Sequence, residues 1–513
     1  MSGIGKALLP LNMIFSIVVP DMADIKFGTS GWRARISEEF TFESVRRLTA
    51  AVAQHVKSNL EFGMRSAEYK AFCGKANPHP AVVVAYDTRF LSPEFAHQVT
   101  EVFAAQDVQV ILAAEDTPTP VAAYAVLNHK ALGGVVITAS HNPASDNGYK
   151  WMPYWGGAAP VAVTDELENR AGLLSPSAVH TMPLAQAIEN RIVAIEDFKP
   201  AYLKHLASLL DLSVLKKSQM KIGVDCLYGT ARHYLRPFLE KLGFEVHAIH
   251  EERNVLFGGS PPEPTEASMA ELKALMSRRG LSIGLACDGD ADRFGILDAH
   301  GVWISANDIL GLVLYHLVKN RGRKGKVARS VMSSHFVDAV AKSFQLETRE
   351  TPVGFKHIGE LLRTGVYLMG GEESAGLSIG GHIPEKDGIL ACLLVLELAA
   401  TEKKPLVKIR EELFKQVGAF YNQRHNFHLK HPEQVIKLQH ALETRPPLEL
   451  AGSSVWRINQ NDGFKFLMKD GSWLGFRSSG TEPMIRLYLE ASSPEKLSRL
   501  LQAGKKVIAQ ITQ

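Results

Sequence analysis

The chain has 513 residues, of which 46% are hydrophobic and 22% charged, and its formal net charge is +3. A chain of this length exceeds one ordinary hydrophobic core, so we expect a globular protein of about two to four domains. The small net charge and the lack of long Lys/Arg blocks argue against a nucleic-acid partner. The four cysteines include no CxxC pair, which argues against a zinc site or disulfide scaffold and favours a reducing compartment.

An apolar stretch near the N-terminus, KALLPLNMIFSIVVP, weakly resembles a signal peptide. It is too short to span a membrane, Pro10 interrupts it, and no A-x-A-like cleavage site follows. We therefore expect a cytoplasmic protein that does not contact membranes. Residues 1–24 are interpreted as an N-terminal extension, or the product of a misassigned start before Met22, and the folded part is expected to begin near Ile25.

Short apolar runs recur along the chain and alternate with longer amphipathic segments such as 93–106, 231–243 and 265–280. Strands that are apolar on both faces and alternate with helices indicate α/β domains with mixed, mostly parallel sheets. The clearest strand candidates are AVVVAY (81–86), VQVILAA (108–114), GGVVITA (133–139), MKIGVDC (220–226), FEVHAIH (244–250), LSIGLAC (281–287) and VARSVMS (327–333).

The tail of the chain has a different pattern. From about Leu413, short alternating runs such as SSVWRIN and FKFLMKD predict an antiparallel sheet, followed by a final helix. The sequence thus predicts three α/β domains and a C-terminal α+β domain, with 171–196 as a connector after the first. The predicted bounds are 25–170, 198–300, 301–412 and 413–513.

Three of the predicted strands end in or beside an aspartate, at the sheet edge where ligands bind in open α/β folds. For Asp87 and Asp225 we expect only a role in bracing the turns that follow. The third strand leads into DGDADR, which is more informative because it places Asp288, Asp290 and Asp292 at alternate positions.

Three carboxylates this close repel one another strongly unless a cation lies among them. A calcium EF-hand is excluded, because Arg293 stands where its glycine would be and Ala299 where its last glutamate would be. A solvated acidic turn is the simpler alternative. The spacing favours Mg²⁺, with coordination positions left open for a phosphate oxygen.

The segment TASHNPASDNG follows the strand candidate 133–139 and contains Ser140 and His141. It has neither the G-x-S-x-G elbow of a hydrolase nor an SxxK motif. A phosphoryl group on Ser140 would supply the oxygen that the magnesium ion lacks. An ordinary Ser/Asn/Pro turn is the alternative interpretation.

Two later loops carry polar groups suited to a sugar phosphate. RSSGTEP (477–483) offers a guanidinium, hydroxyls and backbone N–H groups to a phosphate dianion. GGEESAG (370–376) offers a carboxylate and a hydroxyl to vicinal sugar hydroxyls, although glycine-rich acidic turns are common.

Together with FGTSGWRA near the N-terminus, these segments resemble the α-D-phosphohexomutase superfamily from Phe27 onward, and five motifs occur in the family's order. The resemblance implies four domains around a central cleft. It also implies interconversion of hexose 1-phosphates and hexose 6-phosphates through a phosphoserine, with hexose 1,6-bisphosphate as intermediate and activator. Small-molecule hexose phosphates are then the expected partners, while the oligomeric state is left open.

The resemblance also implies roles for individual residues. Ser140 would carry the phosphoryl group, which would hold one Mg²⁺ together with Asp288, Asp290 and Asp292. Arg33 and Arg293 would lie near that phosphoryl group. Lys150 would assist proton transfer, with His141 as a second candidate. The residues that would contact the sugar or its second phosphate are Lys356, His357, Glu372, Ser374, Arg477, Ser479, Gly480 and Thr481, and a structural role is the alternative for His357.

GEES followed by AG favours a phosphoglucomutase, with a phosphomannomutase or a dual-specificity enzyme as the alternative. FGTSGWRA differs from the FGTDGIRG typical of phosphoglucosamine mutases. The sequence also leaves open a magnesium-dependent sugar phosphatase and a non-catalytic sugar-phosphate sensor. An ATP-dependent kinase is disfavoured because the sequence has no GxxxxGK[ST] loop.

Overall fold

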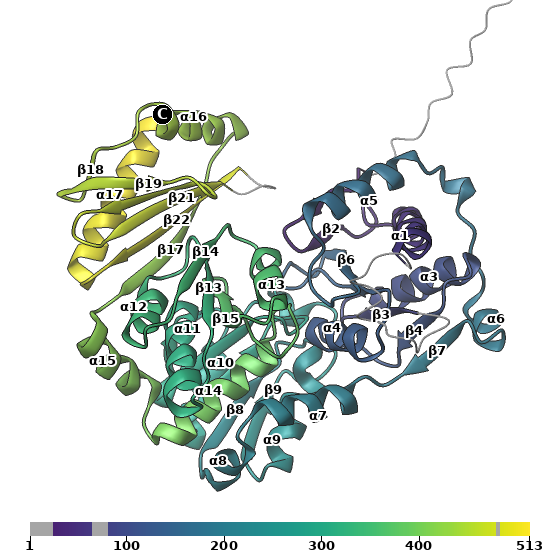
Figure 1. The fold of residues 1–513 in the computed structure, drawn as a ribbon, viewed down its shortest axis with the longest axis horizontal. Coiled ribbons are helices and arrows are strands. Elements are labelled where there is room, and N and C mark those ends of the chain that lie inside the picture. The colour runs from purple at the N-terminus through teal and green to yellow at the C-terminus, as the bar shows by residue number, and fades with distance from the viewer. Residues whose placement is uncertain (1–23, 64–80, 479–482, 513) are drawn as a thin grey trace, which may run out of the picture.

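The structure is a computed structural model, which describes residues 24–63, 81–478 and 483–512. Within these residues the chain forms four sheets. In Figure 1 the fourth sheet lies at the opposite end of the molecule from the first, and the second and third lie between them. None of the described helices is long and apolar enough to cross a lipid bilayer.

The first sheet has seven strands in the order β1-β2-β6-β5-β3-β4-β7. The strands around β3 and β4 are parallel, whereas β6, β2 and β1 are antiparallel additions at one edge. The strands are β1 (Phe27–Gly28), β2 (Gly31–Arg35), β3 (Val82–Tyr86), β4 (Val110–Ala113), β5 (Gly133–Ile137), β6 (Asp146–Pro153) and β7 (Val193–Glu196). The helices are α1 (Phe42–Gly63), α3 (Ser92–Ala105), α4 (Thr119–Asn128), α5 (Val161–Leu173) and α6 (Leu184–Glu189).

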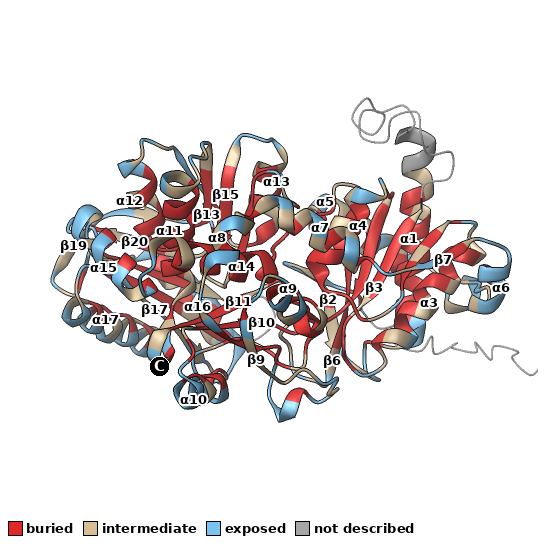
Figure 2. Ribbon diagram, turned by 90° about the horizontal axis from the view of Figure 1, so that it is seen from below, coloured by how far each residue is buried: buried red, intermediate tan, exposed pale blue. Residues whose placement is uncertain are grey.

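Strand β3 shows why this sheet needs helices on both faces. Val82 and Val84 pack into a core with α1 and α3, whereas Val83 and Ala85 pack into a second core with α4. Alternate side chains of a strand point to opposite faces, so a run of apolar residues is stable only when both faces are covered. Figure 2 shows β3 as buried, whereas the peripheral helix α6 is largely exposed.

The second sheet has the order β12-β11-β10-β8-β9, in which β10, β8 and β9 are parallel. Its strands are β8 (Lys221–Asp225), β9 (Glu245–Ile249), β10 (Ile283–Cys287), β11 (Phe294–Asp298) and β12 (Val302–Ile304). Its helices are α7 (Lys199–Leu209), α8 (Leu212–Lys217), α9 (Leu235–Lys241) and α10 (Ala270–Arg279).

The third sheet has the order β14-β13-β15-β16, with only β16 antiparallel to its neighbour. Its strands are β13 (Lys326–Ser330), β14 (Thr348–Thr351), β15 (Tyr367–Glu372) and β16 (Gly376–Ile379). Its helices are α11 (Ala306–Tyr315), α12 (Phe336–Ser343), α13 (Phe355–Arg363), α14 (Gly388–Glu402) and α15 (Leu406–Val417).

The fourth sheet is antiparallel, in the order β17-β22-β21-β20-β19-β18, and α16 and α17 pack together beside it. Its elements are β17 (Tyr421–His428), α16 (Pro432–Thr444), β18 (Glu449–Leu450), β19 (Ser453–Asn459), β20 (Phe464–Met468), β21 (Trp473–Ser478), β22 (Met484–Ala491) and α17 (Pro494–Thr512). Three α/β domains with mixed sheets and an α+β tail confirm the predicted fold class.

The chain passes from one sheet to the next later than the predicted domain bounds. Residues 193–196, expected in a connector, form β7 and pair with β4 of the first sheet. Similarly, β12 pairs with β11, so the second sheet continues past residue 300. Leu413, where the tail was expected to begin, is buried in the core shared with the third sheet. Short or solvent-facing elements such as β7 carry too weak an apolar signal to be assigned to a sheet from sequence.

Candidate active site

Ser140 lies in the turn between β5 and β6, at the carboxyl end of a fully buried strand. Its backbone has a φ of 55°, in the left-handed region that non-glycine residues rarely adopt. The backbone N–H of Ser140 donates to Thr138 Oγ1 at 2.9 Å, which helps to hold this conformation. The serine is 1% exposed. A strained backbone held by its surroundings is typical of a functional turn.

Arg89, which was not predicted, holds this turn in place through hydrogen bonds to its backbone. The side chain is fully buried, and its Nε donates to Asp87 Oδ2 at 3.1 Å. The rest of the guanidinium donates to four backbone carbonyls of the turn, those of Ser140 (2.6 Å), Asn142 (2.7 Å), Pro143 (2.7 Å) and Asp146 (3.0 Å). Because arginine has five N–H donors in a fixed plane, it can fix several carbonyls at once. Asp87 also accepts from the Arg89 N–H and the Ser92 hydroxyl, which is the expected role in the turn after β3, and its link to the serine turn through Arg89 was not predicted.

The three aspartates lie in the turn between β10 and β11. All three are buried, and each offers a carboxylate oxygen such that these oxygens lie within 4.8 Å of one another. Ser140, 148 residues earlier, donates its hydroxyl to Asp288 Oδ2 at 2.8 Å. The structure therefore brings the serine turn of the first sheet against the aspartate turn of the second.

Cationic side chains surround these carboxylates. Lys150 Nζ donates to Asp290 Oδ2 at 2.5 Å and to Asp292 Oδ2 at 2.9 Å. Lys386, which was not predicted, lies 3.1 Å from the same Asp292 oxygen. Thr119, also not predicted, donates its hydroxyl to Asp290 Oδ2 at 2.5 Å. Both missed residues come from segments without a motif of their own.

The carboxylates differ in their pKa. Burial, together with the charges of Asp290 and Asp292, raises the pKa of Asp288 well above its usual range. Burial acts in the same direction on Asp292, but the nearby ammonium groups of Lys150 and Lys386 outweigh it and lower the pKa of this carboxyl. The lysines do not offset the repulsion of Asp288 by the other two carboxylates. A further cation beside Asp288 would therefore stabilise its charged form.

These aspartates fit a divalent metal ion. Oδ1 of Asp290 and Oδ1 of Asp292 are both buried without a hydrogen-bond partner. Buried carboxylate oxygens are normally paired, so orphaned ones indicate room for a ligand that accepts their lone pairs. An all-oxygen set of this kind suits a hard cation such as Mg²⁺.

The positively charged side chains of Arg33 and Arg293 lie near the serine turn, since both act on the pKa of His141. Arg33, on β2, donates from Nη1 to Asn142 Oδ1 at 2.9 Å, and Arg293 Nη1 lies 3.4 Å from Glu263 Oε1. Burial and the charge of Arg293 lower the pKa of Arg33. Arg293 Nε is buried without a hydrogen-bond partner. Two guanidinium groups that repel each other, one with a free donor, suit an oxyanion such as a phosphoryl group.

The two candidates for proton transfer, His141 and Lys150, differ in charge at neutral pH. His141 Nδ1 lies 3.3 Å from Ser140 Oγ, and burial together with the charge of Arg293 lowers the pKa of this imidazole well below its usual value. Burial disfavours the charged form of Lys150 as well, but Asp290 and Asp292 outweigh it and raise its pKa. At neutral pH His141 is a neutral group that can accept a proton, and Lys150 is an ammonium that can donate one.

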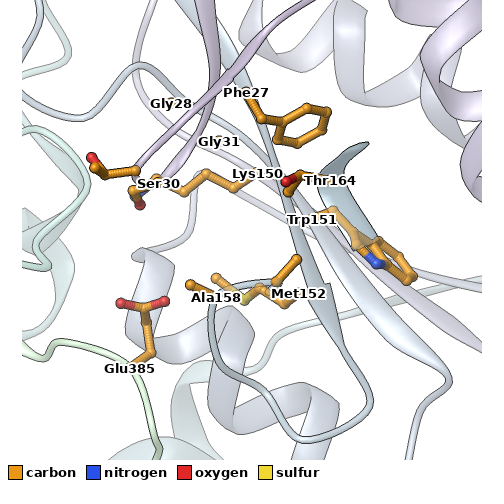
Figure 3. Close-up of a pocket in the computed structure, with 12 residues that line it drawn as sticks. Phe27, Gly28, Ser30, Gly31, Lys150, Trp151, Met152, Ala158, Thr164 and Glu385 are labelled. Carbon is orange, nitrogen blue, oxygen red and sulfur yellow. The ribbon is translucent and has the colours of Figure 1, made fainter. Parts of the chain in front are cut away.

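A pocket opens beside Lys150, between the β1–β2 hairpin and β6 (Figure 3). Polar groups in its lining include Ser30, Lys150 and Glu385, and apolar side chains include Phe27 and Trp151. In Figure 3 Lys150 extends from β6 across the pocket towards Ser30. The pocket thus borders the same lysine that contacts the aspartates.

The sugar-loop candidates lie in the third sheet. Glu372 ends β15, is buried, and accepts from the backbone N–H of Gly354 at 2.7 Å. Burial and the neighbouring Glu373 raise the pKa of Glu372 to about 7. Ser374 is half-buried in the turn to β16. The backbone of Gly376 pairs with that of Arg293, which places the sugar loop against the aspartate turn.

Lys356 and His357 lie in the first turn of α13, which begins at Phe355 directly after Gly354. Burial lowers the pKa of both side chains. Arg477 lies near the end of β21 in the fourth sheet, where its Nε donates to Asp462 Oδ1 at 2.9 Å. The other three predicted phosphate-loop residues, Ser479, Gly480 and Thr481, lie outside the described residues.

Comparisons with known proteins match this arrangement along the chain. The models of the phosphoglucomutase/phosphomannomutase family match as alpha/beta/alpha domain I at residues 24–173, domain II at 200–301, domain III at 305–417 and the C-terminal domain at 426–504. A phosphoglucomutase of Komagataeibacter xylinus is 29% identical, over 91% of this chain and 87% of the relative. A probable phosphomannomutase of Haemophilus influenzae is 30% identical, over 82% of this chain and 90% of the relative.

Among solved structures, a putative phosphomannomutase from Thermus thermophilus superposes with a TM-score of 0.79. It is 29% identical, and the match covers 95% of this chain and 100% of that one. The serine turn and the aspartate turn therefore belong to a fold shared over almost the full length. The chain is a member of the phosphoglucomutase/phosphomannomutase family of phosphoryl-transferring isomerases, a metal-dependent family of enzymes.

Proposed function

We propose that this chain interconverts hexose 1-phosphates and hexose 6-phosphates, with glucose phosphates as the preferred substrates and Ser140 as the phosphoryl carrier. The observation that carries the proposal is the position of Ser140 Oγ. It lies 2.8 Å from Asp288 in the aspartate cluster, next to two arginines that repel each other. A phosphoryl group on this oxygen would meet the arginines on one side and, when the aspartates hold a divalent cation, the charge of that cation on the other.

In the first half-reaction, the O–P bond to Ser140 breaks while a new P–O bond forms to the free hydroxyl of a hexose monophosphate. The hydroxyl proton passes to a base, for which neutral His141 is one candidate and Lys150, once it has lost its proton, the other. The Ser140 oxygen left by the broken O–P bond takes up a proton and becomes a hydroxyl. The product is hexose 1,6-bisphosphate. After the bisphosphate reorients, its other phosphoryl group returns to Ser140, whose hydroxyl gives up its proton, and the oxygen left on the sugar takes up a proton.

Arg33 and Arg293 would stabilise the charge that spreads over the phosphoryl oxygens during transfer. Asp288, Asp290 and Asp292 would hold one Mg²⁺, whose chemistry when bound is to neutralise phosphoryl charge. Glu372 and Ser374 would bind sugar hydroxyls, and Arg477, with Ser479, Gly480 and Thr481, would bind the phosphate that does not react. Lys356 and His357 would face the ligand from α13.

A sugar phosphatase is the main alternative activity, because hydrolysis of phospho-Ser140 would release inorganic phosphate. Ser140 is 1% exposed, which argues for exclusion of water from its hydroxyl oxygen. The relatives carry both the phosphoglucomutase and the phosphomannomutase name, so a phosphomannomutase or dual-specificity enzyme is the second candidate.

The experiment is a coupled assay of the purified chain with Mg²⁺ and a trace of bisphosphate. Glucose, mannose and glucosamine 1-phosphates are supplied in separate reactions, and both hexose 6-phosphate and inorganic phosphate are measured. We expect the highest kcat/KM with glucose 1-phosphate and no stoichiometric phosphate release. Release of phosphate in place of isomerisation would overturn the proposal, and a preference for mannose 1-phosphate would establish the second candidate.

A further inference from the structure

One carboxylate outside the phosphoryl-transfer centre bridges the third and fourth sheets. Asp462 lies in the turn between β19 and β20. Its Oδ1 accepts from Arg477 Nε at 2.9 Å, and its Oδ2 accepts from the backbone N–H of Val353 at 3.0 Å. The two oxygens of one side chain thus hold a guanidinium of the fourth sheet and a loop amide of the third.

The next amide of the same loop continues this connection. The N–H of Gly354 donates to Glu372 Oε1 at 2.7 Å. Val353 and Gly354 are consecutive, so a short peptide segment separates the carboxylate of Asp462 from that of Glu372. Three hydrogen bonds and the covalent backbone of residues 353–354 therefore connect Arg477 with Glu372, the two groups assigned above to the phosphate and the sugar of one ligand.

The turn that carries Asp462 is itself fixed against β21. Gly463 has a φ of 80°, and a Cβ at this position would lie 2.3 Å from the Phe476 carbonyl oxygen and 3.2 Å from Arg477 Cα. Only glycine allows so close an approach of two backbones. The carboxylate of Asp462 is thus held beside Arg477 by backbone packing as well as by its own hydrogen bonds.

Other charged groups face the same carboxylate. Asp462 opposes the effect of burial on the pKa of Lys356, where Asp165 acts more strongly in the same direction, and on that of His357; both residues lie in the first turn of α13. It also raises the pKa of Arg477 against the effect of burial. These three cationic or titratable groups come from two sheets, and Asp462 is the carboxylate that they share.

We propose that Asp462 is a positioning residue for substrate binding. Through Arg477 and the 353–354 amides it sets the distance between the guanidinium that grips the distal phosphate and the carboxylate that binds the sugar hydroxyls. This inference rests on the proposed function, because it assigns Arg477 and Glu372 to one ligand. It goes further in naming the residue that couples the position of Arg477 to that of Glu372.

The test is a double-mutant cycle on the full-length chain, with the affinity for glucose 6-phosphate measured by titration calorimetry. Asp462→Asn keeps the size of the side chain but replaces one carboxylate oxygen with an NH₂ group. Both present partners, Arg477 Nε and the Val353 N–H, are donors, so one of them would lose its acceptor. We expect the affinity to fall about tenfold in the wild-type background. In an Arg477→Gln background the same change should cost about twofold or less, because Asp462 then has no guanidinium to position.

Asp470→Asn is the matched control. Asp470 is in a neighbouring turn of the same domain, where its Oδ1 accepts from the Ser472 N–H at 3.0 Å. The control variant loses the same charge, and its affinity should stay within about twofold of the wild type. Thermal unfolding reports the fold of every variant. If Asp462→Asn is unfolded, Asp462→Glu replaces it under the same criteria, since it moves the carboxylate by one methylene.

A change of less than twofold in the wild-type background, or an equal loss in both backgrounds, would overturn the role of Asp462. Binding does not require turnover, so this outcome is distinct from failure of the proposed function. A wild-type chain that binds glucose 6-phosphate without isomerising it would overturn the function and leave the positioning role testable. A wild-type chain that does not bind the ligand would overturn both.

Discussion

The proposed phosphoryl-transfer end of the site, around Ser140, and the proposed recognition end, around Arg477 and Glu372, are built differently. Around Ser140 the groups are almost fully buried, and one arginine holds four carbonyls of the turn. At Arg477 the side chain is 14% exposed, and the carboxylate that holds it, Asp462, is 23% exposed. The first region is held by many buried hydrogen bonds, whereas the second depends on a few contacts between domains. Changes in the first should therefore lower kcat, and changes in the second should mainly raise KM.

The largest expected effect breaks the phosphoryl-transfer end. Ser140→Ala removes the oxygen that would carry the phosphoryl group, so turnover should fall about 10³-fold or more. The fold should survive, because the change is small. Steady-state kinetics and thermal unfolding measure the two effects. The control is Ser145→Ala on the same turn, whose exposed hydroxyl bonds to the neighbouring Asp146. Full activity of Ser140→Ala would remove the phosphoserine from the mechanism.

The next effect concerns the aspartate cluster. Chelation with EDTA should abolish turnover, and Mg²⁺ should restore it. Asp290→Asn should raise the Mg²⁺ concentration needed for half-maximal activity by about tenfold or more, because one ionic oxygen ligand is lost. Asp298→Asn is the control, since Asp298 is a buried aspartate at the far end of β11 that caps α15. An identical magnesium titration for Asp290→Asn and the wild type would count against the metal site.

A third change tests whether the rigidity of the serine turn matters. Arg89→Lys keeps the charge but cannot bond four carbonyls and Asp87 together. We expect a loss of stability of about 3–5 kcal/mol, as for broken buried ion pairs, and a fall in kcat of about tenfold. Urea unfolding and kinetics measure these effects. Arg35→Lys, at an exposed pair with Glu38, should change stability by about 1 kcal/mol or less. Unchanged kcat in a folded Arg89→Lys variant would show that the strained turn needs no brace.

The smallest expected effect is a pH dependence of sugar binding that arises from Glu372, at the proposed recognition end. Burial and Glu373 raise the pKa of Glu372 to about 7, so this carboxyl is mostly protonated below that pH and mostly charged above it. Sugar hydroxyls donate better to the charged form, so affinity for glucose 1-phosphate should improve about three- to tenfold as the pH rises across this pKa. Glu372→Gln should flatten this part of the profile, and parallel profiles would exclude the role.

The raised pKa of Glu372 also makes the free energy of unfolding depend on pH. Between its ordinary value of 4.5 and about 7, the folded chain keeps a proton that the unfolded chain has lost. The contribution of this group to the free energy of unfolding therefore falls as the pH rises through that window.

Much of this molecule was predictable from local patterns. Apolar runs such as 281–287 predicted strands, and β10 occupies Ile283–Cys287. The alternate aspartates led to the buried cluster because their spacing is unusual for a turn. The helix expected from residue 265 begins only at Ala270, since Thr265 and Ser268 form a hydroxyl-to-backbone turn before it. Such hydroxyls compete with the helix for backbone groups, and apolar periodicity does not report this competition.

The residues that the sequence analysis missed act across long separations. Arg89 contacts a turn more than fifty residues away, with a separation of 51 to Ser140. Asp462 meets Val353 at a separation of 109, and Thr119 meets Asp290 at 171. None of these residues stands in a motif, because their partners are fixed by the packing of sheets and not by neighbours along the chain. Single-sequence reasoning finds reactive groups by their clustering, and it does not find the residues that hold them.

The contact between Ser140 and Asp288 also orders events during synthesis. The two residues are 148 positions apart and follow strands of different sheets. A ribosome extends the chain at about 5–20 residues per second, so Asp288 is synthesised on the order of ten seconds after Ser140. The nascent first domain therefore emerges without the acidic half of its centre, and the enzyme gains its chemistry only when the second domain has folded against it.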